Sequence, residues 1–117
     1  MADREEIEVL SFLAEFKRLL AERRAYIAGN RNINRNALIE LSITENQRKE
    51  CLMNLSKSDY SEGPLRDEKR GGDVWIFGKV VHSREVYIKL AINLWREKNA
   101  VCISFHPSER PLDYPFK

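Results

Sequence analysis

The chain has 117 residues, of which 43% are apolar and 32% are charged, and this composition predicts one globular domain over residues 1–117. Its formal net charge of +2 argues neither for nor against a nucleic-acid partner. No apolar run reaches the roughly 20 residues that a membrane-spanning helix needs, so we expect no membrane partner.

The first half of the chain is predicted to be helical. Apolar residues at helical spacing predict one long amphipathic helix over residues 3–27. A short helix is expected over residues 37–41. A capping-box pattern at Thr44 and Gln47 predicts a third helix over residues 45–55.

A sheet is predicted after a long polar connection over residues 56–72. Strands are expected over residues 73–81, 84–94 and 100–106, and the short turns between them imply antiparallel pairing. The fold class is therefore α+β, with N-terminal helices packed on one face of a small antiparallel sheet. The Pro-rich tail, residues 107–117, should fold over an edge or face of the sheet, with Tyr114 and Phe116 as anchors.

The last two strands alternate apolar and polar residues, which predicts one buried face and one polar face. On the second strand, Tyr87 and Lys89 share the polar parity. The third strand should present Val101, Ile103 and Phe105 on one face and Cys102, Ser104 and His106 on the other.

In an antiparallel pair the polar groups of the two strands would converge. A phenol, an ammonium and an imidazole could then cleave a phosphodiester without a metal. A base would take the proton of a ribose 2′-hydroxyl, a cation would stabilise the phosphorane, and an acid would protonate the leaving 5′-oxygen. The same pattern also fits a solvent-exposed sheet face with no chemistry, and this alternative remains open.

Other residues have two readings each. The stretch RDEKRGG offers Arg66, Lys69 and Arg70 for phosphate contacts, or else is a solvated loop. Trp75 and Phe77 could stack on bases, or else form core against the first helix. The two histidines and two cysteines show no metal-ligand spacing, so neither a metal nor a cofactor is expected. The acidic N-terminus argues against a signal peptide, and with two lone cysteines we expect a cytoplasmic protein.

Four segments carry a resemblance to a known family: Leu55–Tyr60, Asp73–Trp75, Val86–Lys89 and Cys102–Phe105. In this order, over about residues 35–106, the chain resembles the MqsR-type toxins of bacterial toxin–antitoxin pairs, which belong to the wider RelE-like group. The resemblance implies a compact RelE-like endoribonuclease that cleaves mRNA without a metal and halts translation, free or on the ribosome. It also implies a cognate antitoxin protein as partner.

The resemblance also implies roles for individual residues. Tyr87 matches a strand tyrosine implicated in cleavage, and Lys89 matches the lysine two positions later. Three positions depart from the family pattern: Glu62 stands in place of a lysine, Ile76 in place of a glutamine, and His106 in place of a lysine. His106 would take the proton-transfer role that C-terminal histidines have in other RelE-like toxins.

The leading hypothesis is therefore a toxin of a type II toxin–antitoxin module that acts as a metal-independent mRNA endonuclease. Tyr87 and His106 would transfer protons. The phosphorane would be stabilised by Lys89, with Lys79 or Arg110, and the tail would complete the site with Arg110 and Tyr114. The alternative is a non-catalytic regulatory module of the same fold that binds a protein or the ribosome, and Glu62 and Ile76 favour it. A plain structural domain is the third reading.

Overall fold

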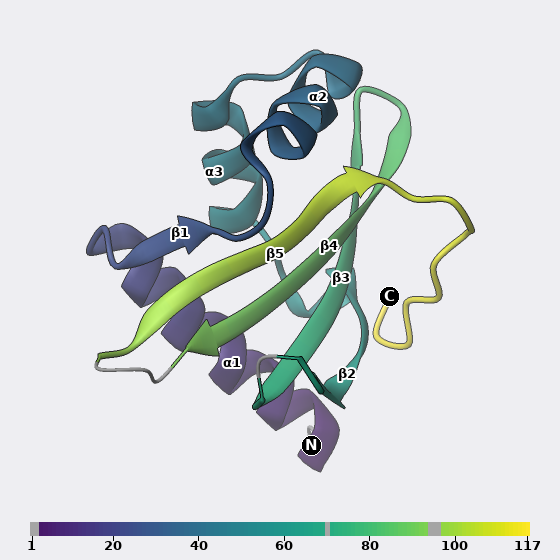
Figure 1. Cartoon of the computed structure of the whole chain (residues 1–117). Coiled ribbons are helices and arrows are strands. Elements are labelled where there is room, and N and C mark those ends of the chain that lie inside the picture. Colours follow the sequence, from purple (N-terminus) through teal and green to yellow (C-terminus); the bar gives the residue numbers. More distant parts are fainter. Residues whose placement is uncertain (1–2, 70, 94–96) are drawn as a thin grey trace.

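The computed structural model describes residues 3–69, 71–93 and 97–117, and within them the chain forms three α-helices and a five-stranded sheet (Figure 1). The expected α+β class is confirmed. In chain order the elements are α1 (Arg4–Ala21), β1 (Ala25–Ile27), α2 (Arg31–Leu41), α3 (Glu45–Met53), a short 3₁₀ helix η1 (Lys57–Asp59), β2 (Tyr60–Arg66), β3 (Asp73–Val81), β4 (Arg84–Asn93) and β5 (Asn99–Pro107). None of the described helices has the length and apolar character needed to cross a membrane.

The sheet is mixed, with the strand order β1-β5-β4-β3-β2. Neighbouring strands pair antiparallel except at one edge, where β1 runs parallel to β5. The prediction of a wholly antiparallel sheet is wrong at this edge, because the first helix ends earlier than expected. Arg23 adopts a left-handed conformation with φ of 61°, and the Arg24 N–H donates to the Leu19 carbonyl at 2.9 Å. This C-terminal cap releases the chain to form β1.

The other boundaries follow local chemistry. The Thr44 hydroxyl accepts from the Gln47 N–H at 3.1 Å, and the Gln47 amide oxygen accepts from the Thr44 N–H at 2.8 Å, which confirms the predicted capping box. α2 is longer than predicted because Asn30 caps it, so that it begins at Arg31, six residues upstream of the expected start. β2 lies inside the segment that was predicted to be a loop, at the sheet edge, where Pro64 costs no ladder hydrogen bond to a further strand.

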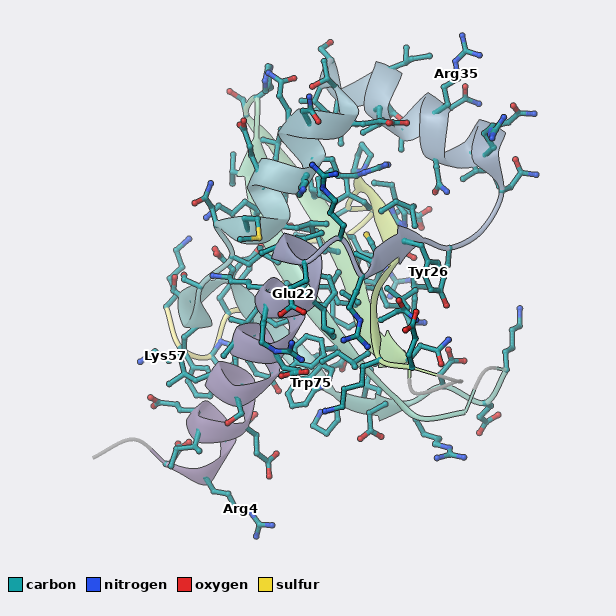
Figure 2. The ribbon with its side chains drawn as sticks, turned by 90° about the vertical axis from the view of Figure 1, so that its left-hand side faces the viewer. Arg4, Glu22, Tyr26, Arg35, Lys57 and Trp75 are labelled. Atoms are coloured by element: carbon teal, nitrogen blue, oxygen red, sulfur yellow. The ribbon has the colours of Figure 1, made fainter. Side chains whose placement is uncertain are left out.

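The core lies between α1 and one face of the sheet, and α1 crosses behind the strands in Figure 1. The ring of Phe12 stacks on that of Trp75 with centroids 4.9 Å apart, and it lies 6.1 Å from the ring of Phe77. Figure 2 shows Trp75 beside α1, where its side chain is 8% exposed. The core reading of Trp75 and Phe77 is therefore confirmed, and neither ring is free to stack on a base.

A bulge in β5 places Cys102 on the face opposite to the predicted one. Lys89 pairs with Ser104 but Leu90 pairs with Cys102, so Ile103 is an extra residue that reverses the alternation upstream of it. Cys102 therefore points into the core, 2% exposed, and not onto the polar face as predicted. Its burial raises the pKa of the thiol to about 12, which keeps it protonated at neutral pH.

Buried thiols and phenols should make the fold sensitive to alkali. Burial raises the pKa of Cys51 to about 11 and those of Tyr60 and Cys102 to about 12, and it also raises the pKa of Tyr87 and of Tyr114. A group whose pKa rises on folding stabilises the protein below its unfolded pKa, and that contribution is lost as pH rises through the folded value. We expect the melting temperature, followed by circular dichroism, to fall between pH 9 and pH 12. A constant melting temperature over this range would contradict the buried positions of these groups.

Candidate active site

The polar groups predicted on β4 and β5 meet on the face of the sheet opposite α1. Tyr87 pairs in register with His106, and Lys89 pairs with Ser104. Because cross-strand partners point to the same side, these four side chains share one face. The rings of Tyr87 and His106 are stacked, with centroids 5.3 Å apart and planes 17° from parallel.

The orientation of the His106 ring is set by its neighbour. Its Nδ1 lies 2.9 Å from the Pro107 carbonyl oxygen. A carbonyl can only accept, so Nδ1 carries the proton and donates to it. In the neutral tautomer with its proton on Nδ1, the ring presents an unprotonated Nε2, which is the form that a general base needs.

Tyr87 is suited to the opposite role. Its partial burial, and to a smaller extent the negative charge of Glu62, raise the pKa of the phenol above its ordinary value of 10.0. The hydroxyl therefore keeps its proton at neutral pH. A base and a protonated donor thus stand side by side on one surface.

A cleft of about 550 Å³ opens beside this pair. One wall carries Tyr87 and His106, and the other is the tail from Ser108 to Leu112, which includes the exposed Arg110. The tail is held by Glu85, whose carboxylate accepts from the Leu112 N–H at 3.0 Å and from the Tyr114 hydroxyl at 2.7 Å. Figure 1 shows the tail folding back beside β3. The predicted anchors are confirmed, since Phe116 also stacks on Tyr60 at 5.4 Å.

Sequence reasoning overlooked Glu85 and Gly78, which position the tail. Glu85 has the same strand parity as Tyr87, which was the signal in the sequence that it lies on the same face. Gly78 pairs with Tyr87 across the β3–β4 ladder, and a Cβ there would overlap the Tyr114 hydroxyl and lie 2.6 Å from the Leu112 side chain. The missing side chain of Gly78 is therefore what lets the tail lie next to Tyr87.

Substitution of Gly78 by alanine should destabilise the protein by about 1–3 kcal/mol, because the added methyl group overpacks the contact with the tail. Urea unfolding measures the loss. The Tyr114→Ala background is the control, since truncation of the tyrosine removes the clash, and the cost of Gly78→Ala should shrink there. An equal cost in both backgrounds would mean that the tail does not rest on Gly78.

The structure does not bring all predicted site residues together. Lys79 pairs in register with the buried Val86, so it points to the face opposite Tyr87, and its Nζ lies 3.2 Å from an Asp59 carboxylate oxygen. Its predicted role beside Lys89 is therefore not supported by its position. Arg66 pairs with Asp73, five residues along β3 from Gly78 and thus about 17 Å from the Tyr87 row.

The other predicted positions lie in different parts of the structure. Lys69 is exposed in the connection after β2, where its N–H donates to Asp67 at 3.1 Å, and Arg70 lies outside the described residues. The departures Glu62 and Ile76 pair in register, and Ile76 pairs in turn with Lys89, so all three share the face of Tyr87. Glu62 is exposed there, whereas Ile76 is 3% exposed. Within the described ranges, no three His, Cys, Asp or Glu side chains gather as metal ligands.

Comparisons with protein-family models, with curated proteins and with solved structures give no significant match to this chain.

Proposed function

We propose that this protein is a metal-independent endoribonuclease that cleaves mRNA, as the toxin of a type II toxin–antitoxin pair. The observation that carries the proposal is the stacked pair of Tyr87 and His106, with His106 Nδ1 held by the Pro107 carbonyl and a protonated phenol beside a cleft. The resemblance to MqsR-type toxins supplies the biological context: an mRNA substrate in the cytoplasm, free or on the ribosome, and an antitoxin protein as partner.

The proposed reaction is an internal transesterification. His106 Nε2 accepts the proton of a ribose 2′-hydroxyl, and the 2′-oxygen attacks the adjacent phosphorus. Lys89 and Arg110 stabilise the negative charge on the phosphorane. Tyr87 donates its proton to the departing 5′-oxygen as the P–O5′ bond breaks. The products are a 2′,3′-cyclic phosphate and a 5′-hydroxyl, and solvent then takes the extra proton from His106 and returns a proton to Tyr87.

Purified protein should cleave mRNA in a buffer that contains EDTA. The cleaved strand should carry a 2′,3′-cyclic phosphate, and a 2′-deoxy nucleotide at the scissile position should abolish cleavage there. The deoxy substrate is the internal control, because it removes the nucleophile and leaves the phosphates in place. Intact mRNA after incubation with and without ribosomes would argue against the enzyme.

A non-catalytic binding module is the second candidate, and Glu62 favours it. Its exposed carboxylate lies on the face of Tyr87, where it repels an RNA backbone and would attract a basic protein. Induced expression separates the two functions. A nuclease arrests growth and its His106→Ala variant does not, whereas a binding module gives the same growth with both forms.

A further inference from the structure

A second cavity, of about 600 Å³, lies on the side of the molecule where β1, α2 and α3 meet. Three arginines line it: Arg31 and Arg35 from α2, and Arg48 from α3. Among the described residues that line it, Glu45 is the one carboxylate. The described lining residues of the Tyr87–His106 cleft are all different from those of this cavity.

Arg48 is the unusual member of the set. It lies one helical turn before Leu52 on α3, and the two share a face that points into the protein. The Arg48 side chain is 8% exposed, yet it makes no hydrogen bond or ion pair with any residue in the described part of the chain. Its guanidinium nitrogens are not among the fully buried polar atoms of the described residues that lack a partner, so they reach the cavity that Arg48 lines and are open to a ligand there.

Arg31 and Arg35 also lie at positions where a positive charge is unfavourable. Arg31 and Arg35 are one turn apart near the start of α2, so their like charges repel each other. They also lie at the positive end of the helix dipole, and the first turn of α2 contains no acidic residue. Among the described residues neither arginine is within ion-pair distance of a carboxylate, Glu45 included.

We propose that this cavity, defined by Arg31, Arg35 and Arg48, binds a phosphate-bearing ligand of about nucleotide size. A phosphate group would supply the missing counter-charge and accept paired hydrogen bonds from planar guanidinium groups. The volume falls in the range of small-molecule sites, and Ile27 and Leu38 provide an apolar wall for the group that carries the phosphate. The proposal does not depend on RNA cleavage at the other face.

The phosphate could come from a free nucleotide or from a nucleic-acid backbone, and calorimetric titration distinguishes the two. The probes are inorganic phosphate, adenosine 5′-monophosphate and a 2′-deoxy oligonucleotide with a 5′-hydroxyl end, which resists cleavage through a 2′-hydroxyl. Binding of the first two assigns a phosphate monoester as ligand. Binding of the oligonucleotide alone assigns backbone phosphates.

In either case the affinity should depend on the arginines of the cavity. We expect Arg48→Met to weaken binding by about tenfold or more, and Arg35→Gln to weaken it to a similar degree. Arg4→Gln is the matched control, since it also removes one positive charge. Figure 2 shows Arg4 and Arg35 at opposite ends of the molecule, and the control should bind as the wild type does.

A second readout separates binding from a purely structural role. Without phosphate, Arg48→Met should melt at the same temperature as the wild type or higher, because within the described residues the Arg48 side chain has no hydrogen bond or ion pair to lose. If Arg48→Met fails to fold, the Arg35→Gln variant alone tests the proposal, because Arg35 is exposed. The proposal is wrong if the wild type binds none of the three probes, or if Arg4→Gln weakens binding as much as the cavity variants do.

Discussion

Replacement of His106 by alanine should lower the rate of RNA cleavage by ~10²-fold or more, because it removes the proposed base for the 2′-hydroxyl proton. Tyr87→Phe should cause a loss of the same order, since it removes the proposed proton donor and keeps the ring that stacks on His106. Single-turnover cleavage of a short RNA, with enzyme in excess, measures both effects without a contribution from product release.

The chain provides a matched control for each variant. His82 is the other histidine of the sequence and is exposed in the β3–β4 turn, so His82→Ala should cleave as the wild type does. Tyr26 is exposed on β1, where its hydroxyl accepts from Asn93 at 2.9 Å, and Tyr26→Phe should also retain activity. Figure 2 shows Tyr26 on this edge strand. Wild-type rates in both His106→Ala and Tyr87→Phe would place the chemistry elsewhere.

The part of the fold that was predicted well has strong local signals. β3 begins and ends at the predicted residues, and the capping box of α3 is formed by Thr44 and Gln47. β1 and β2 were not predicted, for two different reasons. β1 has three residues, too few to show a period, and α1 ends at a left-handed Arg23 where a glycine would have marked the end. β2 contains Gly63 and Pro64 and has two register shifts, which conceal its alternation.

The candidate site shows how far strand parity can be followed in a sequence. Parity correctly placed Tyr87 with Lys89, and Ser104 with His106, on shared faces, but the register that pairs Tyr87 with His106 depends on the bulge at Ile103, which lies between the β4–β5 connection and this pair. The same reasoning failed for Cys102 because one extra residue, Ile103, reverses the face. Lys79 was assigned to the wrong face of the sheet. The sequence did contain the signal, because Lys79 has the same strand parity as Trp75 and Phe77.

Features that depend on contacts between distant segments had no signal in the sequence. The burial of Arg48 requires α2, α3 and β1 to meet around it, and its position in α3 looks like that of any polar helix residue. The cleft beside Tyr87 requires the tail to return to Glu85. Prolines in the tail show that it leaves the sheet, but they do not show where it comes to rest.

Replacement of Phe77 by alanine should destabilise the protein by about 3–5 kcal/mol, the range for removal of a buried aromatic ring. Phe77 is 0% exposed, and its ring lies 6.0 Å from that of Tyr60 and 6.1 Å from that of Phe12. It therefore joins α1, β2 and β3 in one cluster, and the cavity left by the ring cannot close without moving the helix.

Urea unfolding measures this loss, with Val80→Ala as control. Val80 lies on the same strand but is 66% exposed, so its truncation should cost less than about 1 kcal/mol. Small domains are stable by only about 5–15 kcal/mol, so the expected loss is a large share of the total. Because Gly78 follows Phe77 and faces Tyr114, a disturbed β3 would also shift the tail that forms the cleft. A cost for Phe77→Ala as small as that of the control would contradict the packing of α1 on this face of the sheet.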